Sequence, residues 1–221
     1  KQKTAYEISL GLVGSEMCIR DRSSAYLIGS IPFGLLIGKI VKGIDIRDHG
    51  SGSTGATNLL RICGPICGIS ALILDMSKAV IPMIVTIHLL EVSNWIHPFT
   101  GIAIICGHSW PICIKFKGGK GIASGWAALF ILSPISGLIA TATGLPIIAL
   151  TRYVSLGSLA GSTAGCASLV FLSLHSFENL TKIPTSYFFF ALAGWMITVG
   201  LHKQNMNRLI KGTESKIGTR I

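Results

Sequence analysis

The chain has 221 residues, of which 50% are hydrophobic and only 13% are charged, whereas about a quarter of a typical soluble domain is charged. Intrinsic disorder requires low hydrophobicity and is excluded. The formal net charge is +10, but the basic residues lie in short clusters between long apolar runs, so we expect no nucleic-acid partner and predict one polytopic membrane domain.

Residues 1–22 do not resemble the rest of the chain. Two stretches, 1–8 and 12–21, match translations of the two fixed parts of a transposon-type sequencing-library primer, at the spacing that an index would leave. A secretory signal would need an unbroken apolar core, which charged residues such as Glu16 interrupt. We expect residues 1–22 to be translated adapter, and residues 23–221 to be a single membrane domain that lacks the start of its first helix.

Seven apolar segments follow the expected adapter. A transmembrane helix needs about 20 apolar residues, or fewer where it borders a water-filled cleft. One segment, 122–132, is too short to cross alone, and only Ser133 and Pro134 separate it from the next. Five crossings are required, and seven result if both segments of this pair cross, so we predict an all-α protein with seven transmembrane helices. The segments are 25–41, 66–90, 95–114, 122–132, 135–150, 154–174 and 184–201.

The basic residues between these segments set the orientation. With seven crossings, thirteen Lys and Arg residues lie on one side, and Lys182 lies on the other with Glu91 and Glu178. The side richer in basic residues is cytoplasmic, so the C-terminus is expected inside and the N-terminus outside. The thirteen are Lys39, Lys42, Arg47, Arg61, Lys115, Lys117, Lys120, Arg152, Lys203, Arg208, Lys211, Lys216 and Arg220.

The first polar motif occupies residues 45–61. Its glycines formally match GxGxxG, but a dinucleotide site needs a preceding buried strand, and apolar segments flank this motif on both sides. Glycine N–H groups and hydroxyls still favour an anion, and a helix starting near Ala56 would direct its N-terminus at the same point; a flexible polar loop is the alternative. The candidates are Gly50, Ser51, Gly52, Ser53, Thr54, Gly55, Thr57 and Arg61.

The second polar motif contains Lys120 among Gly118, Gly119 and Gly121. Its spacing does not fit a Walker A loop. Because these residues precede an apolar helix, free N–H groups and an ammonium are expected together at a helix N-terminus, which favours a phosphate or an oxyanion. Basic residues that only mark the cytoplasmic side would not explain three glycines around one lysine.

The third polar motif follows the last apolar segment. His202 and Asn205 lie three residues apart on one helix face, and Asn205 and Arg208 nearly share a face. A solvated basic tail is the alternative. Asp75 and Lys78 lie inside the second segment, where a mutually neutralising structural pair is at least as good an explanation as a functional one.

In this order, the three motifs resemble the PlsY family of bacterial acyl-phosphate:glycerol-3-phosphate acyltransferases. The resemblance begins at residues 26–34, runs through the motifs and covers residues 25–217. One departure is Ser53, where the family usually has Asn. A serine keeps the ability to form hydrogen bonds, so the departure concerns fine geometry.

The resemblance implies seven membrane helices in the bacterial cytoplasmic (inner) membrane, with an active site that faces the cytoplasm. It also implies a reaction. The acyl group of fatty acyl phosphate passes to the 1-hydroxyl of sn-glycerol 3-phosphate, which gives 1-acylglycerol 3-phosphate (lysophosphatidate) and phosphate in phospholipid biosynthesis. The expected partners are these two substrates, the lipid bilayer and a soluble enzyme that makes acyl phosphate; no metal and no cofactor are expected.

The same resemblance implies the site. No activated nucleophile is visible, so we expect direct transfer by positioning, with the leaving phosphate taking the hydroxyl proton. The alternative function is a transporter of phosphate or an organic anion, which would bind near the bilayer midplane and often contain internal repeats. The expected catalytic residues are Lys120, Ser51, Arg61, His202 and Asn205. The expected binding residues are Gly50, Gly52, Ser53, Gly55, Thr57, Asn58, Gly118, Gly119, Gly121, Arg208 and Glu214.

Overall fold

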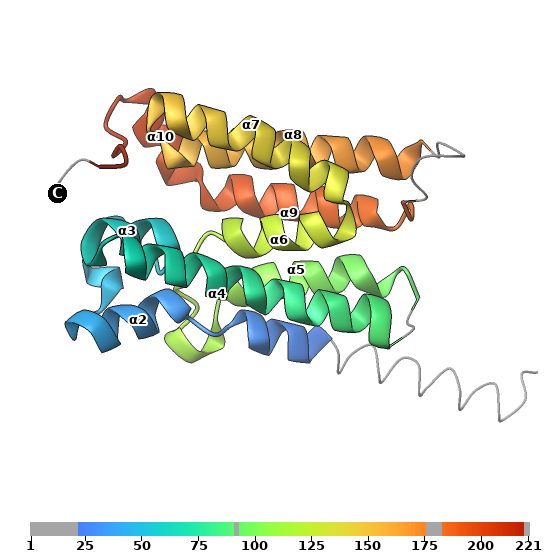
Figure 1. Cartoon of the computed structure of the whole chain (residues 1–221), viewed down its shortest axis with the longest axis horizontal. Helices are drawn as coiled ribbons and strands as arrows, with labels where there is room; N and C mark the ends of the chain where they lie inside the picture. Colours follow the sequence, from blue (N-terminus) through green and yellow to red (C-terminus); the bar gives the residue numbers. More distant parts are fainter. Residues whose placement is uncertain (1–21, 91–92, 176–182, 219–221) are drawn as a thin grey trace, which may run out of the picture.

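The computed structural model describes residues 22–90, 93–175 and 183–218, and all regular structure within these ranges is helical (Figure 1). The expected adapter lies outside the described residues except for Arg22, which begins a helix over 22–29. The further α-helices are α2 (Phe33–Lys42), α3 (Ala56–Cys63), α4 (Pro65–Ile84), α5 (Ile96–Ser109), α6 (Ile122–Leu132), α7 (Pro134–Thr151), α8 (Val154–Leu174), α9 (Tyr187–Leu201) and α10 (Lys203–Ile210). Shorter turns are η1 (Ile46–Asp48), η2 (Val85–Leu89) and η3 (Ile112–Ile114).

Several helices begin and end where the sequence predicted. α6 and α8 have the expected bounds. Between α6 and α7, the Ser133 hydroxyl accepts the backbone N–H of Ser136 at 3.3 Å, and Pro134 fills the first position of α7. Ser at the N-cap and Pro just after it are favoured for physical reasons, since the hydroxyl satisfies a free N–H and Pro has none to satisfy. The expected segments 122–132 and 135–150 are therefore two separate helices, α6 and α7.

The first apolar segment, in contrast, is broken where one helix was expected. The helix over 22–29 ends at a turn, and α2 begins after Pro32, which has no N–H to donate. The carbonyls freed by the break have other donors. Cys113 donates its Sγ–H to the carbonyl of Ser30 (3.1 Å), and the ammonium of Lys78 donates to the carbonyl of Ile31 (3.1 Å).

Four helical stretches of the described chain are long and apolar enough to cross a membrane: Arg22–Lys42, Pro65–Leu89, Pro134–Thr151 and Val154–Leu174. The sequence predicted at least five. The expected crossing at 95–114 corresponds to α5, which has only 14 residues, because Pro111 disfavours a helical conformation at Trp110 (φ −127°, ψ 63°). α9 has 15 residues. The count of seven crossings stays a prediction.

Small residues let the helices of the bundle approach closely. A Cβ at Gly161 of α8 would lie 2.7 Å from the carbonyl oxygen of Ala140 in α7, and one at Gly144 of α7 would lie 2.9 Å from that of Gly157. Glycines at such contacts are typical of helix pairs in membranes. α6 lies between the α4–α5 layer and the α7–α9 layer (Figure 1). Its buried residues join Ile104, Leu169 and others in the main apolar core.

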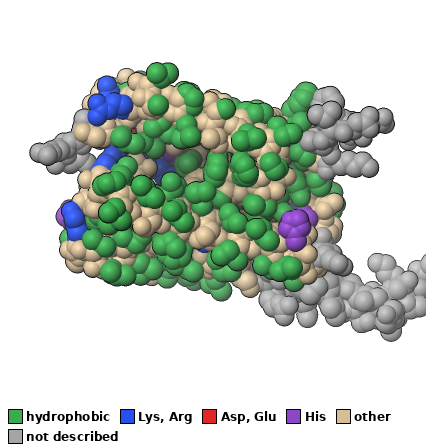
Figure 2. All heavy atoms as spheres, viewed as in Figure 1, with side chains coloured by type: hydrophobic (Ala, Val, Ile, Leu, Met, Phe, Trp, Pro, Cys, Tyr) green, Lys and Arg blue, Asp and Glu red, His purple; other side chains and the backbone are tan. Residues whose placement is uncertain are grey.

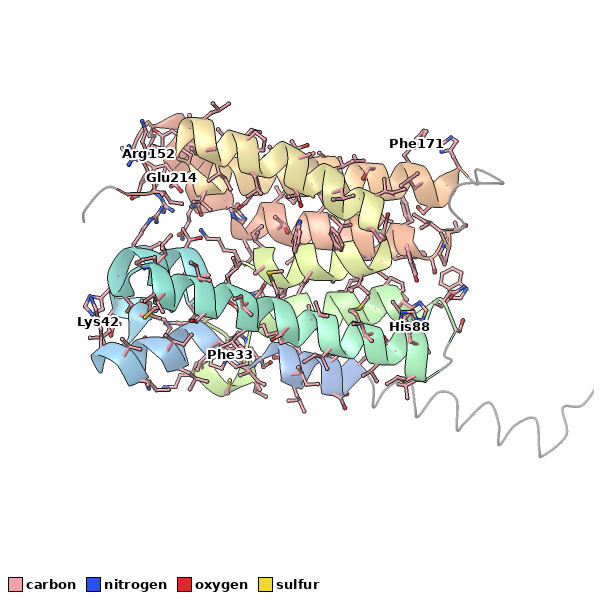
Figure 3. The ribbon with its side chains drawn as sticks, in the orientation of Figure 1. Phe33, Lys42, His88, Arg152, Phe171 and Glu214 are labelled. Atoms are coloured by element: carbon pink, nitrogen blue, oxygen red, sulfur yellow. The ribbon has the colours of Figure 1, made fainter. Side chains whose placement is uncertain are left out.

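The two ends of the bundle differ in character. α3, α10 and the turn between α7 and α8 lie together at one end, which we call the polar end (Figure 1). Lys42, Arg152 and Glu214 lie there, whereas His88 and Phe171 lie at the opposite end (Figure 3). The structure thus brings the first and third polar motifs to one end.

Candidate active site

Asn58 holds the first polar motif in shape. Its Nδ2 donates to the carbonyls of Ile46 (3.1 Å), His49 (3.0 Å) and Ser53 (2.9 Å), and its Oδ1 accepts the backbone N–H of Ser51 (2.9 Å). The side chain is 2% exposed. Asn58 was expected to bind phosphate. In the structure its amide is bonded within the loop and fixes the position of Ser51, and a contact of Asn58 with phosphate stays a prediction.

Gly50 and Ser53 complete this loop. Gly50 has a φ of +59°, and a Cβ there would lie 2.4 Å from the Oδ1 of Asn58, so both conformation and space require glycine. Ser53, which replaces the asparagine usual in the family, accepts the backbone N–H of Gly55 through its hydroxyl (3.2 Å). The predicted helix does start at Ala56, as α3. The loop and the first turn of α3 therefore form one rigid corner.

The second polar motif differs from the prediction in one respect. The N–H groups of Gly118 and Gly119 were expected to be free for an anion, but they donate to the carbonyls of Ser109 (3.2 Å) and His108 (3.1 Å) at the end of α5. The prediction fails because these acceptors lie nine and eleven residues away in sequence and become neighbours only in the fold. A Cβ at Gly119 would lie 2.0 Å from the Nε2 of His108. These two glycines serve close packing, and Lys120 is the group that the loop presents.

Lys120 joins a chain of hydrogen bonds across the site. Its ammonium donates to the Oδ1 of Asn205 (2.5 Å), whose Nδ2 donates to the Oε1 of Glu214 (2.7 Å). The hydroxyl of Ser155 donates to the same oxygen (2.7 Å), and the Nε of Arg208 donates to the Oε2 of Glu214 (2.7 Å). The segment that begins at Val154 was expected to approach the same site, and it supplies Ser155 to this network. Glu214 was expected to bind substrate; it lines both cavities and accepts these three hydrogen bonds, and its contact with substrate stays a prediction.

The charges of this network follow from its burial. The pKa of Lys120 is lowered to about 8. Burial is the main cause, Glu214 opposes it, and nearby Arg208 and Arg61 add to the lowering. Burial raises the pKa of Glu214, but hydrogen bonds from Asn205, Ser155 and Arg208 outweigh it, so that the pKa is lowered overall. At neutral pH the site therefore holds a carboxylate among three cations, an arrangement that attracts further negative charge.

His202 lies at the junction of α9 and α10 and is 2% exposed. Its Nδ1 lies 2.8 Å from the carbonyl oxygen of Thr198, so Nδ1 carries the proton and Nε2 is left as an acceptor. Burial lowers its pKa, as does nearby Lys120, while the Thr198 carbonyl opposes them. The ring is thus neutral at pH 7 and oriented by a backbone carbonyl.

Arg61 extends from α3 towards the third polar motif. One terminal nitrogen donates to the carbonyl of Ser215 (3.0 Å). Its Nε is buried and has no hydrogen-bond partner among the residues that the structure describes. A buried charged donor without a partner is costly. This Nε–H group is therefore able to donate to an anionic group bound at the site.

Two cavities meet at these residues. The larger has a volume of about 540 Å³ and the smaller about 230 Å³. Ser51, Arg61 and Glu214 line both, and Gly50 and Arg208 line the smaller. The predicted site residues that line the larger are Ser51, Ser53, Gly55, Thr57, Asn58, Arg61, Lys120, Gly121, His202, Asn205 and Glu214. Gly52, Gly118 and Gly119 line neither of these two.

The larger cavity changes character with depth. Besides the polar motifs, its lining includes many apolar side chains of α4, α6 and α7, such as Leu72, Met76, Leu129 and Ile148. Figure 2 shows the hollow on this face of the molecule, with Lys or Arg side chains inside it and hydrophobic side chains around it. Asp75 and His108 also line this cavity, although the sequence gave them no role in the site. The site can thus hold anionic groups at its polar end and an alkyl chain further in.

The comparisons with known proteins agree with this geometry. A family model described as glycerol-3-phosphate acyltransferase matches residues 23–212. Glycerol-3-phosphate acyltransferase of Thermoanaerobacter sp. (strain X514) is 42% identical over 195 residues, which cover 88% of this chain and 92% of that protein. Glycerol-3-phosphate acyltransferase 2 of Thermotoga maritima is 43% identical over 192 residues, or 87% and 92% of the two chains.

Solved structures give the same result. The fold is similar to the crystal structure of PlsY, an integral membrane glycerol 3-phosphate acyltransferase, in its glycerol 3-phosphate form, with a TM-score of 0.82 and 34% identity over 92% of this chain and 96% of that one. The lysophosphatidic acid form matches with a TM-score of 0.80 and 33% identity over the same shares. With its long apolar helices, this likeness makes the chain a multi-pass membrane protein. The chain belongs to the glycerol-3-phosphate acyltransferase family, in its PlsY branch.

Proposed function

We propose that this chain transfers an acyl group from acyl phosphate to the 1-hydroxyl of glycerol 3-phosphate, giving 1-acylglycerol 3-phosphate and phosphate. One observation carries the proposal: the partly buried cations Arg61 and Lys120 stand where a polar mouth opens into a largely apolar cavity of about 540 Å³. Acyl phosphate has a phosphate at one end and an alkyl chain at the other. It fits such a cavity with its phosphate at the cations and its chain among Leu72, Met76 and Ile148.

The smaller cavity suits the second substrate. Gly50, Ser51, Arg61 and Arg208 line it, and two guanidinium groups are well suited to binding a phosphate. Since Ser51 and Arg61 line both cavities, glycerol 3-phosphate in the smaller one would direct its hydroxyl into the larger. The two substrates then meet beside Lys120.

In the proposed reaction the 1-hydroxyl oxygen of glycerol 3-phosphate attacks the carbonyl carbon of acyl phosphate. The new C–O ester bond forms, and the bond between the carbonyl carbon and the phosphate oxygen breaks. Negative charge develops on the carbonyl oxygen, where the Lys120 ammonium stabilises it. The leaving phosphate takes the hydroxyl proton. His202, neutral and with Nε2 as an acceptor, holds the glycerol hydroxyl, and Asn205 fixes the Lys120 ammonium.

We also propose that the polar end faces the cytoplasm, with seven crossings, the C-terminus inside and the N-terminus outside. Lys42 and Arg152 lie at the polar end (Figure 3), and basic residues favour the cytoplasmic side. The short α5, α6 and α9 would cross beside longer neighbours, since α6 packs against α4, α5 and α7. Glycerol 3-phosphate would enter from water at this end, and acyl phosphate, made by a soluble enzyme, from the bilayer at the hollow of Figure 2.

One assay tests the reaction. Purified protein in detergent, given long-chain acyl phosphate and glycerol 3-phosphate, is expected to release phosphate and lysophosphatidate in equal amounts. Acyl-CoA and acyl carrier protein should not replace the donor. If glycerol 3-phosphate crosses the membrane of proteoliposomes without any product being formed, the transporter alternative is correct. The position of Arg61 and Arg208 argues against a transporter, because α3 and α10 lie at one end of the bundle instead of near its middle (Figure 1).

A further inference from the structure

A buried charged cluster lies directly beneath the loop that carries Lys120. Asp75 and Lys78 of α4 form an ion pair, with 2.9 Å between Oδ1 and Nζ and side chains that are each 2% exposed. The Nδ1 of His108, in the last turn of α5, lies 3.5 Å from the same oxygen of Asp75. Charges buried this deeply inside a membrane protein are costly and are functional candidates by default.

The cluster reaches the Lys120 loop from both sides. Before Lys120, the ring of His108 lies against Gly119, and the carbonyl of His108 accepts the N–H of that glycine (3.1 Å). After Lys120, the hydroxyl of Ser124 in the first turn of α6 donates to the backbone carbonyl of Asp75 (2.8 Å). Asp75 thus reaches one flank of the loop through His108 and contacts Ser124 just after the other.

The two nitrogens of the His108 ring exclude a direct catalytic role. Nδ1 faces Asp75, and Nε2 is packed against the backbone of Gly119. Neither nitrogen is directed towards a reacting group in the cavity. An Asp–His pair that served as a base would need its outer nitrogen open to the substrate.

We propose that Asp75, acting through His108, is a positioning residue that holds the Gly118–Gly121 loop so that the Lys120 ammonium stays at its buried place in the acyl-transfer site. This inference deepens the proposed function. Lys78 has a structural role of its own, because it also donates a hydrogen bond to the carbonyl of Ile31, where the first segment is broken (3.1 Å). The alternative is that Asp75 only neutralises Lys78.

The titration of Lys120 distinguishes positioning from neutralisation. In the intact protein Lys120 titrates at about 8 because it is buried. The groups that face it are Arg61 of α3, His202 and Arg208 around α10, and Glu214 of the C-terminal segment. If the loop is released, Lys120 becomes solvated, and its pKa rises towards 10.5. Acetylation of Lys120 by acetic anhydride, followed across pH by mass spectrometry of its peptide, reads this pKa without any turnover.

The variant Asp75→Asn/Lys78→Met removes both charges and leaves nothing to neutralise. We expect the labelling midpoint of Lys120 to move above pH 9 and kcat to fall roughly ten- to a hundredfold, as for a misplaced catalytic group. His108→Phe, which keeps the buried ion pair, should do the same. Met83→Ala, a core change in α4 away from both cavities, should lower Tm without moving the midpoint.

The inference is overturned if Lys120 keeps its midpoint near pH 8 in His108→Phe or in the double variant. If the double variant fails to fold, His108→Phe alone decides. Because labelling requires no substrate, a wild-type protein that makes no lysophosphatidate contradicts the proposed function only, while the labelling midpoint still decides whether Asp75 and His108 hold the loop.

Discussion

Replacing Lys120 by methionine tests the centre of the proposed site. The methionine keeps most of the buried stem but removes the ammonium that donates to Asn205 at 2.5 Å. Glu214 keeps its hydrogen bonds from Asn205, Ser155 and Arg208, so the fold should persist. Loss of one charged donor to a developing oxyanion costs roughly 3 kcal/mol, or about a hundredfold in kcat. The measurement is lysophosphatidate release at saturating substrates, with Tm as the check on folding.

The pH dependence of the same residue sharpens the test. With a pKa of about 8, Lys120 loses its charge above pH 8, so wild-type kcat should fall there, and this alkaline limb should be missing from the residual activity of Lys120→Met. Whereas kcat should fall as the pH rises above 8, the contribution of Lys120 to stability should increase. The folded pKa lies below the ordinary 10.5, so the unfolded chain binds more protons between about pH 8 and 10.5, and the contribution of Lys120 to the free energy of unfolding rises with pH in that window.

Lys117 provides the matched control, because it lies on the same loop but is exposed. Lys117→Ala should keep both kcat and the alkaline limb. Near-normal turnover of Lys120→Met, or an unchanged alkaline limb in that variant, would refute the assignment of Lys120 to the oxyanion.

Three further variants probe the rest of the site. Arg61→Ala should lower kcat/KM about a hundredfold and stay folded, because the side chain makes one hydrogen bond, to the carbonyl of Ser215, and its Nε has no partner among the described residues. Normal activity would remove Arg61 from the site. His202→Gln should raise KM for glycerol 3-phosphate and keep turnover at saturation, whereas loss of turnover with intact binding would make His202 the general base. Gly194→Val should shift the preference to shorter acyl chains, because Gly194 lines the larger cavity with room for a Cβ. Gly200→Val is the control: Gly200 lies in the same helix but faces open space, so this variant should keep the chain-length preference.

Helix bounds could be predicted from the sequence where local chemistry sets them. Ser133 and Pro134 separate α6 from α7 by capping and by a missing N–H, both of which are visible in the sequence. The break before α2 was not predicted from the sequence, although Pro32 lies within the expected first segment. A helix can tolerate a proline when other groups satisfy the freed carbonyls, and the donors here, Cys113 and Lys78, come from distant segments. The family match begins at residue 23, next to the expected end of the adapter.

The site was predictable as a set of motifs but not as a set of roles. Spacing and composition indicated that three polar motifs share one end, and the structure brings Lys120, Asn205 and Glu214 together. The roles depended on hydrogen bonds between distant residues. Asn58 and Glu214 were expected to contact substrate, yet their side chains are occupied by the loop and by neighbouring cations. His108 lies 33 residues after Asp75 in the sequence, and only the fold places it beside that residue.

The short α6 explains how one bundle can serve a water-soluble and a lipid substrate. Its 11 residues span about 16 Å, roughly half of the hydrocarbon thickness of about 30 Å. The remaining depth is taken by the glycine loop, because Gly121 adopts a φ of +72° and begins the helix inside the bundle. Backbone without helical hydrogen bonds is tolerated at such depth only inside protein or beside a wet cavity. In the proposed reaction, the Lys120 ammonium would meet the carbonyl of acyl phosphate held in the larger cavity, and glycerol 3-phosphate would approach from the polar end.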